Sequence, residues 1–260
     1  MAGTVRLEKE GAIGFLVFDY PERRNAISLG MWLEIPGVLA RLAADADVRV
    51  VVVRGAGDVA FISGADISEF SRMRSGDGAR EYDAANVRAF AALLDFDKPL
   101  IAMIHGFCVG GGVAIAITAD LRYAADDATF AVPAARLGLG YPPSGIETLV
   151  DVVGTSTAKE FFFTARRFNA TEALARRLVT EVKPKADLDA YVRATATQIS
   201  ENAPLTLKSV KVVARELRKP ASARDVEGVD RSVSDCYASR DYDEGVRAFL
   251  EKRPPKFEGR

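Results

Sequence analysis

The segment from Gly106 to Asp120, GFCVGGGVAIAITAD, constrains the fold of this chain more than any other. Its three consecutive glycines, at 110 to 112, open a small, apolar, helix-compatible run without acid or base before Asp120. Glycines at a helix start let the backbone approach a ligand closely and leave N–H groups for it. Because the helix dipole adds partial positive charge there, the run predicts an oxyanion hole whose proton-transfer groups come from elsewhere.

The same glycines have two other interpretations, a phosphate loop or a site of close packing. The run lacks the Gly-Lys-Ser/Thr ending of a P-loop and the G-x-G-x-x-G spacing of a dinucleotide site. A second stretch, FISGADI at 61–67, offers a partner, because Gly64 permits a tight turn after a strand and Asp66 can cap the next helix. Either motif alone is explained by an ordinary strand-turn-helix junction.

Composition narrows the class of protein and its partners. The chain has 260 residues, enough for one large domain or a domain with a smaller appendage. With 35 basic and 36 acidic residues, we expect no nucleic-acid and no membrane partner. Two cysteines and one histidine predict no metal site and fit a reducing, cytoplasmic location. The first residues lack the order of a signal peptide, and no apolar run reaches the ~18–20 residues that span a bilayer.

Apolar patterning predicts an α/β architecture. We expect strands at residues 5–7, 13–18, 48–53 and 100–104. We expect one helix that follows Ser28 and runs through Ala44, divided or kinked at Pro36, and another at 80–94. After Gly138 the helix-start signals dominate, among them Ser144-x-x-Glu147. The alternation of strands and helices up to about residue 135 predicts a sheet covered by helices.

One helix of the last third carries a basic side. Its apolar stripe consists of Leu207, Val210, Val213, Ala214 and Leu217. Its other side carries Lys208, Lys211, Arg215 and Arg218. Because the whole chain is nearly neutral, we expect a solvated face or a subunit contact there rather than a nucleic-acid footprint.

Four ordered motifs resemble the enoyl-CoA hydratase, or crotonase, superfamily. They are PERRNAIS at 21–28, SGADI at 63–67, HGFCVGGG at 105–112 and EGVRAFLEKRPPKF at 244–257. The resemblance covers nearly the whole chain and implies a spiral of repeated ββα units as a core domain over residues 1–200. It further implies a C-terminal helical oligomerisation region over 201–260, which forms homotrimers that often pair into homohexamers.

The resemblance also implies a ligand, a coenzyme A thioester, with no separate cofactor. Its carbonyl oxygen would accept hydrogen bonds from the backbone N–H groups of Ala65 and Gly111. The implied coenzyme contacts are Arg23, Arg24, Ala26, Ala65, Asp66 and Ile67 and, from a neighbouring subunit, Phe249 and Lys252. For Lys252 a solvated charge is an equal alternative.

The chain departs from the hydratases of this superfamily at both catalytic glutamates. The matching positions are Ala114 and Ala134. Two backbone N–H donors stabilise a thioester enolate independently of which side chains these residues carry. Hydration also needs one group that activates water and another that protonates the α-carbon. The two-glutamate hydratase route is therefore not expected, and a one-base isomerase route loses its residue at Ala134.

The other ionisable groups near the motifs have structural interpretations. We expect Asp66 to cap a helix, Glu147 to form a capping box with Ser144, and Asp120 to cap or pair where its helix ends. His105 precedes the glycines, and we expect it to be a buried hydrogen-bonding residue at a strand end rather than a base.

Tyr141, in LGLGYPPSG, is the polar side chain that we expect in the acyl pocket. The loop resembles that of methylmalonyl-CoA decarboxylases, which also carry a tyrosine there, although they have histidine where this chain has Ala65. Decarboxylation forms the enolate by losing CO₂, so no base has to remove a carbon-bound proton. Packing at the pocket rim is the alternative role of Tyr141.

Three functions follow from these residues. The first is an acyl-CoA lyase that decarboxylates a malonyl-type thioester through the oxyanion hole. The second is a hydratase or isomerase whose acid or base has moved, to Glu69, Glu81, Asp83 or Tyr141. The third is a catalytically silent acyl-CoA-binding subunit.

Overall fold

Two sheets form the centre of the computed structural model, which describes residues 2–69 and 77–260. The larger sheet has the order β1 (Thr4–Glu10), β2 (Ile13–Asp19), β3 (Val50–Gly55), β5 (Leu100–Ile104), β7 (Leu121–Ala125) and β10 (Glu181–Lys183). The smaller sheet has the order β4 (Ala60–Ile62), β6 (Phe107–Val109), β8 (Thr129–Ala131) and β9 (Phe168–Asn169). The β1–β2 and β8–β9 pairs are antiparallel and the other pairs are parallel.

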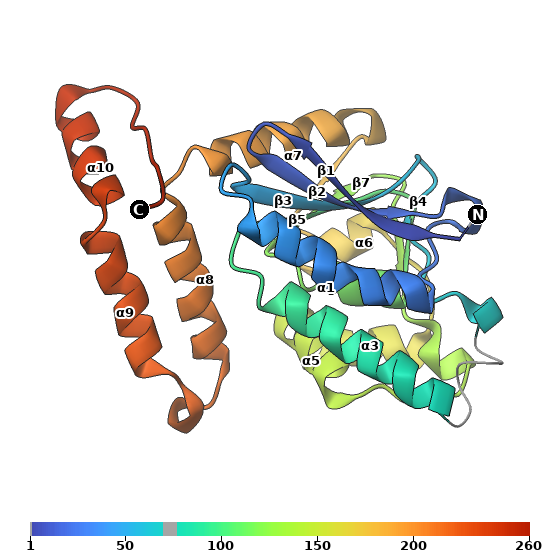
Figure 1. Cartoon of the computed structure of the whole chain (residues 1–260). Coiled ribbons are helices and arrows are strands. Elements are labelled where there is room, and N and C mark those ends of the chain that lie inside the picture. Colours follow the sequence, from blue (N-terminus) through green and yellow to red (C-terminus); the bar gives the residue numbers. More distant parts are fainter. Residues whose placement is uncertain (1, 70–76) are drawn as a thin grey trace.

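Helices surround both sheets (Figure 1). The α-helices are α1 (Leu29–Ala44), α3 (Asp77–Leu94), α4 (Gly111–Ala116), α5 (Pro143–Thr164), α6 (Ala170–Ala175), α7 (Lys185–Ser200), α8 (Pro204–Arg218), α9 (Val226–Tyr237) and α10 (Arg240–Glu251). Short 3₁₀ turns are η1 (Pro21–Arg23), η2 (Ile67–Glu69), η3 (Pro133–Arg136) and η4 (Ala221–Ala223). None of the described helices is long and apolar enough to cross a membrane.

Alternation along the central strands divides the core into two layers. On β2 and β3, Leu16 and Val53 belong to the layer that holds α1, whereas Val17 and Val52 belong to the layer that holds α7. Successive side chains of a strand point to opposite faces, so apolar runs such as Val50 to Val53 are buried on both sides. Figure 1 shows α7 on one face of the sheet and α1 with α3 on the other.

The chain repeats a strand–strand–helix unit, and this repeat positions the candidate site. In the units β3–β4–α3, β5–β6–α4 and β7–β8–α5, the first strand lies in the larger sheet and the second in the smaller one. Since β4, β6 and β8 lie side by side, the segments that leave them meet at one edge. Both predicted glycine motifs follow such strands, at Gly64 and at Gly110 to Gly112. The predicted spiral of ββα units is confirmed.

Most predicted elements are confirmed, and two details of the helices are wrong. The strand at 100–104 coincides with β5, and Ser28 caps α1 by accepting a hydrogen bond from the Met31 N–H at 3.3 Å. Pro36 does not divide α1, which runs unbroken because Trp32, Ile35 and Leu39 hold it against the core. Proline removes one hydrogen bond, and the buried face outweighs that loss.

The predicted capping box at Ser144 and Glu147 is also wrong. The helix α5 begins at Pro143, with Pro142 as its N-cap and no side-chain cap. Proline at the first helical position needs no N–H partner and already has a helical φ. Ser144 therefore lies inside the first turn, where its carbonyl accepts a hydrogen bond from the Thr148 hydroxyl at 3.0 Å.

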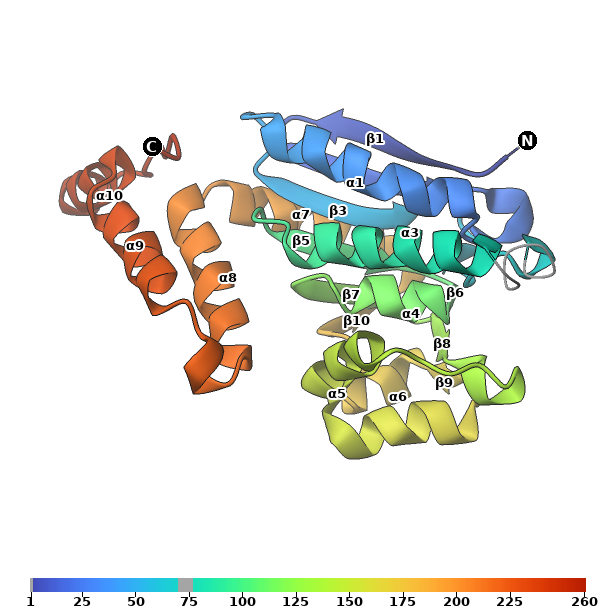
Figure 2. The same ribbon diagram turned by 60° about the horizontal axis from the view of Figure 1, so that its bottom comes forward.

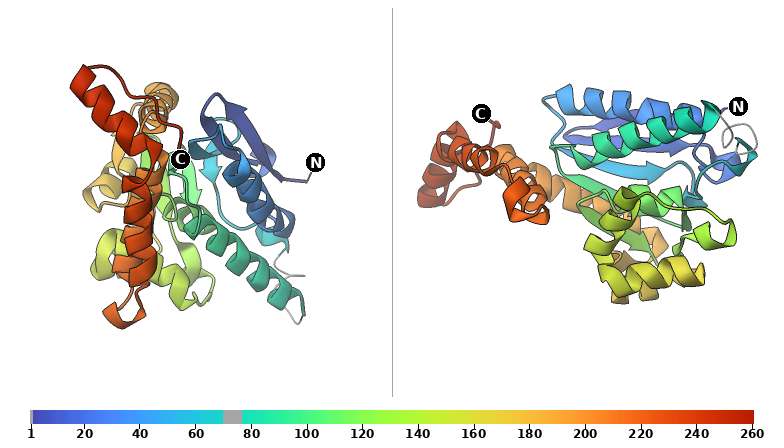
Figure 3. Two further views of the ribbon diagram at one scale, coloured as in Figure 1. Left: turned by 60° about the vertical axis from the view of Figure 1, so that its left-hand side comes forward. Right: turned by 90° about the horizontal axis from the view of Figure 1, so that it is seen from below.

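The last three helices extend from the core as an arm (Figures 1 and 3). The basic side of α8 meets acidic residues of the core: Lys208 pairs with Asp97 at 2.8 Å and Lys211 pairs with Asp120 at 2.7 Å. This side therefore makes ion pairs within the chain, which we did not expect, and a subunit contact there stays a prediction. The stripe residue Val210 is 62% exposed. An oligomerisation role for residues 201–260 stays a prediction.

Candidate active site

The start of α4 leaves a backbone donor open. Gly110 is the N-cap, with φ at 53°, and its own N–H donates to the Ala131 carbonyl at 2.8 Å. The first helical bond joins the Ala114 N–H to the Gly110 carbonyl at 3.1 Å. Within the described residues the Gly111 N–H donates no backbone hydrogen bond. A helix start presents such a donor with partial positive charge, as the glycine run predicts.

The segment after β4 supplies a second open donor. The Ile27 N–H donates to the Gly64 carbonyl at 2.8 Å, and the Asp66 N–H donates to the Ile27 carbonyl at 2.9 Å. Because alternate residues of a parallel bridge face opposite ways, the Ala65 N–H points away from Ile27. In the described part of the chain it has no backbone acceptor.

The two open donors lie side by side. A Cβ atom built on Gly111 would be 3.8 Å from the Ala65 nitrogen, and one built on Gly64 would be 3.2 Å from the Val109 carbonyl oxygen. Gly64 has φ at +114°, which side chains rarely adopt. The structure thus brings the two predicted backbone donors close together. Such a pair is suited to a carbonyl oxygen that gains negative charge.

The predicted coenzyme loop lies against the Ala65 segment. The Ser63 N–H donates to the Arg24 carbonyl at 3.1 Å, and the Ser63 hydroxyl donates to the Arg23 carbonyl at 3.2 Å. Both arginines are exposed, while Ala26 is buried. The predicted contacts Asp66 and Ile67 follow Ala65 directly in the chain, and a coenzyme contact of these six residues stays a prediction.

Asn25 holds that loop in place, and the sequence analysis missed it. It is buried with φ at 55°, in the left-handed region that asparagine tolerates better than most residues. Its side-chain oxygen accepts from the Tyr20 N–H at 2.9 Å, and its side-chain nitrogen donates to the Ala56 and Ala60 carbonyls at 3.0 and 2.8 Å. The sequence signal for this role was the position of Asn25 between a pair of arginines and an apolar run.

Ala114 and Ala134, which the resemblance matches to the hydratase glutamates, carry only methyl groups. Ala114 is half-buried one helical turn after Gly111, between the buried Val113 and Ile115, and Ala134 is buried in η3. The end of β8 adjoins the glycines through the hydrogen bond from Gly110 to Ala131. The acid and base of a two-glutamate hydratase are therefore missing from both places.

The nearby carboxylates are engaged elsewhere or point outward. Glu69 accepts a hydrogen bond from the Leu29 N–H at 2.9 Å, so it stabilises the start of α1. Asp66 accepts from the Ser68 N–H at 3.0 Å, the capping role that we expected, although the described turn is only η2. On α3, Glu81 and Asp83 are exposed, and the buried side chain between them is Tyr82.

Asp120 confirms the pairing that we expected of it. Its carboxylate accepts from the Leu100 N–H and from the Lys211 ammonium, each at 2.7 Å. It therefore joins β5 to α8 and does not belong to the site.

Tyr141 is half-buried on the loop between η3 and α5. Its ring packs edge-on against Phe162 of α5, with the ring centroids 4.8 Å apart. Edge-on packing fixes the ring and leaves the hydroxyl at one end. This contact fits the packing role of Tyr141, and a role of its hydroxyl in the acyl pocket stays a prediction.

Phe249 and Lys252 do not join this site within one chain. Both lie on the arm, where Phe249 is 84% exposed and Lys252 ends α10 with φ at 55°. Figure 2 shows the arm at the opposite end of the molecule from the start of α3. Contact with the coenzyme of a neighbouring subunit stays a prediction for both.

His105 is buried directly after β5, as predicted, but its side chain is not satisfied. Its Nε2 atom has no hydrogen-bond partner among the described residues. Burial holds the pKa of His105 below 6.5, and the nearby Lys185 and Arg54 charges lower it further against the opposing effect of Asp127 and Asp58. A neutral imidazole with a low pKa is a structural group rather than a cationic acid.

We expect His105 to make the protein sensitive to acid. The unfolded chain takes up a proton near pH 6.5, whereas the folded chain resists it, so stability falls as the pH drops below 6.5. His105 alone lowers the free energy of unfolding by up to about 1.4 kcal/mol for each pH unit below 6.5. Melting temperatures between pH 8 and pH 5 measure the slope, and His105→Asn is expected to flatten it. An equal slope in that variant would assign the acid sensitivity to other groups.

Comparisons with known proteins agree with this geometry. A family model described as Enoyl-CoA hydratase/isomerase matches residues 8–260. The chain is 33% identical over 258 residues to a short-chain-enoyl-CoA hydratase of Clostridium acetobutylicum, covering 98% of this chain and 97% of the relative. It is 30% identical to a carnitinyl-CoA dehydratase of Escherichia coli, with all of both chains covered.

A solved structure has a similar fold over nearly the whole chain. It is an enoyl-CoA hydratase/isomerase family protein from Hyphomonas neptunium, which superimposes with a TM-score of 0.94 at 36% identity over 98% of each chain. The family model, the relatives and the fold all extend over nearly the full length. The chain therefore belongs to the enoyl-CoA hydratase/isomerase family.

Proposed function

We propose that the chain binds an acyl-CoA thioester with its carbonyl oxygen at the Ala65 and Gly111 N–H groups and decarboxylates a malonyl-type acyl group. The observation that carries this proposal is that two open backbone donors lie together while Ala114, one turn after Gly111, and Ala134, in η3, carry only methyl groups. The donors stabilise an enolate, and the methyl groups offer no base that would form it by proton removal.

Decarboxylation supplies the enolate without a base. The bond between the α-carbon and the carboxylate breaks, and its electron pair moves into the thioester as CO₂ leaves. The oxygen that becomes negative accepts hydrogen bonds from Ala65 and Gly111, and the α-carbon then takes a proton from water. The apolar surroundings favour loss of the carboxylate charge, because desolvation raises the free energy of the charged group.

The coenzyme would lie along the loop of Arg23, Arg24 and Ala26. The two exposed guanidinium groups have no ion-pair partner within the described residues, so they are available to phosphate groups. In a homotrimer or homohexamer, Phe249 and Lys252 of a neighbouring arm would complete this surface. Asp66 and Ile67 border the same segment.

Hydration or isomerisation is the second candidate, and the names of the relatives favour it. The relatives include a short-chain-enoyl-CoA hydratase, a carnitinyl-CoA dehydratase and a Δ(3,5)-Δ(2,4)-dienoyl-CoA isomerase of Arabidopsis thaliana. This function needs an acid or base outside Ala114 and Ala134. Glu69 could act as this acid or base only if its carboxylate no longer accepted the hydrogen bond from the Leu29 N–H.

Incubation with malonyl-, methylmalonyl- and crotonyl-CoA, followed by mass spectrometry of the thioesters, separates these functions. We expect loss of CO₂ from a malonyl-type substrate and no ordinary rate of crotonyl-CoA hydration. Hydration alone would establish the second candidate. Binding without turnover of any substrate would identify a silent acyl-CoA-binding subunit.

Tyr141→Phe tests the polar group of the acyl pocket. If the hydroxyl orients the substrate carboxylate, its loss is expected to lower the decarboxylation rate by about 10- to 100-fold, the typical effect of a hydrogen bond to a charged group. The ring and its contact with Phe162 remain. Tyr237→Phe removes an exposed hydroxyl from α9 as the control. An unchanged rate in Tyr141→Phe would leave Tyr141 with packing alone.

A further inference from the structure

The indole of Trp32 forms one wall of the space between the two open donors. Trp32 is the only tryptophan of the chain and is buried on α1. Its Cζ2 atom is 3.4 Å from the position of a Cβ atom on Gly111, and the Ile27 Cδ1 atom is 3.7 Å from the same position. Since the Ala65 nitrogen lies 3.8 Å from that position, the indole edge borders the oxyanion hole directly.

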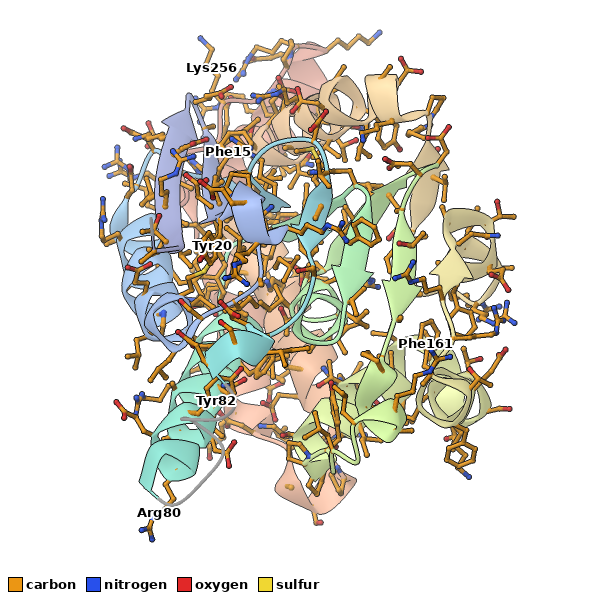
Figure 4. The ribbon with its side chains drawn as sticks, turned by 90° about the vertical axis from the view of Figure 1, so that its right-hand side faces the viewer. Phe15, Tyr20, Arg80, Tyr82, Phe161 and Lys256 are labelled. Atoms are coloured by element: carbon orange, nitrogen blue, oxygen red, sulfur yellow. The ribbon has the colours of Figure 1, made fainter. Side chains whose placement is uncertain are left out.

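Helix α3 holds this indole from two sides. The Trp32 Nε1–H donates a hydrogen bond of 3.1 Å to the Tyr82 hydroxyl, and the Phe90 ring lies 5.3 Å from the indole in a tilted arrangement. Tyr82 is 4% exposed. Figure 4 shows Tyr82 on the side of α3 that faces the body of the molecule, whereas Arg80 projects outward.

The wall matters for a group that becomes negative. An aromatic ring carries partial positive charge at its edge, and it is the edge atom Cζ2 that borders the hole. The ring also excludes water, which strengthens hydrogen bonds from the two N–H groups to the oxygen. Both effects need the indole at a fixed position, because electrostatic stabilisation depends on preorganised groups.

We propose that Tyr82 is a positioning residue of the oxyanion hole, which acts through its hydrogen bond to Trp32. This inference rests on the proposed binding of a thioester carbonyl at Ala65 and Gly111. Without the Tyr82 oxygen, the indole N–H is a buried donor without that acceptor, so the ring shifts or water enters. Tyr82 then contributes to the affinity for the thioester carbonyl and does not contribute to the affinity for the coenzyme A portion of the ligand.

A comparison of two ligands measures how much the thioester carbonyl contributes to the affinity. Acetyl-CoA has the thioester carbonyl, whereas S-ethyl-CoA has a methylene group in its place. For the wild-type protein we expect acetyl-CoA to bind about tenfold tighter or more, the effect of two hydrogen bonds. Tyr82→Phe is expected to lower this ratio about three- to tenfold and to leave the dissociation constant of S-ethyl-CoA within about twofold. Tyr191→Phe on α7, which removes a hydroxyl that donates to the Glu181 carboxylate of β10, is the matched control.

A double-mutant cycle tests whether Tyr82 acts through Trp32. Trp32→Phe removes both the N–H and the Cζ2 edge, so Tyr82→Phe is expected to have no further effect in that background. Trp32 fluorescence supplies a second readout in the Tyr82→Phe variant, because no other tryptophan contributes. Acetyl-CoA is expected to change the emission of the wild type more than S-ethyl-CoA does, and Tyr82→Phe is expected to reduce that difference.

The outcomes separate this inference from the proposed function. An unchanged ratio and unchanged emission difference in Tyr82→Phe, or losses that add in the double variant, would overturn the positioning role. Equal affinity of the wild type for the two ligands would contradict the proposed function itself, and the inference would fall with it. A lower ratio in Tyr82→Phe alone, absent from Tyr191→Phe and not additive with Trp32→Phe, supports it.

Discussion

A methyl group on residue 111 is expected to lower turnover of the acyl-CoA substrate by about 10²- to 10³-fold, the usual effect of losing one oxyanion donor. In Gly111→Ala the new Cβ atom lies 3.4 Å from the Trp32 ring, an ordinary contact, and 3.8 Å from the Ala65 nitrogen. It therefore narrows the space beside the two donors, where we propose that the carbonyl oxygen binds, without a clash in the fold. Rates measured beside melting temperatures check this expectation.

The control for Gly111→Ala is Gly37→Ala. Gly37 lies inside α1 with nothing within 4 Å of an added Cβ atom, so alanine there is expected to leave the rate unchanged. It is expected to add about 0.5–1 kcal/mol of stability. Near-normal turnover by a folded Gly111→Ala protein would mean that the oxygen does not bind between Ala65 and Gly111.

The neighbouring change, Gly112→Ala, is expected to damage the fold instead. Its Cβ atom would lie 2.2 Å from the Ile62 carbonyl oxygen, which belongs to the backbone of β4 and has to move. Overpacking of this kind costs ~3 kcal/mol, which for a chain of this size lowers the melting temperature by about 6–12 °C. Thermal unfolding of both variants beside the wild type measures the contrast. Equal melting temperatures would show that α4 is not seated on β4 as described.

The pair of open backbone donors was predictable because glycines place both of them. The motifs at Gly64 and at Gly110 to Gly112 determine local geometry, and the ββα repeat then brings them to one edge of the smaller sheet. The missing glutamates were also predictable, since they are identities at matched positions, Ala114 and Ala134. Motifs of this kind need little tertiary information.

The supports of the hole were not predictable, because they depend on contacts between distant parts of the chain. Asn25 bonds carbonyls 31 and 35 residues away, and Trp32 bonds a hydroxyl 50 residues away. The predicted polar candidates Glu81 and Asp83 are the sequence neighbours of Tyr82. Only the packing of α3 against α1 decides which of these three side chains is buried. The wrong helix start at Ser144 has a local origin instead, since its neighbours Pro142 and Pro143 form the N-cap and the first helical position.

The most direct test of decarboxylation without a base follows deuterium from D₂O into the α-carbon of the product. With methylmalonyl-CoA in D₂O, we expect enzyme-dependent release of CO₂ and propionyl-CoA that gains one deuterium when the enolate is protonated. Propionyl-CoA incubated alone with the protein is predicted to keep its α-hydrogens, because Ala114 and Ala134 provide no base. Exchange of those hydrogens, or hydration of crotonyl-CoA without any release of CO₂, would contradict an oxyanion hole that works without paired carboxylates.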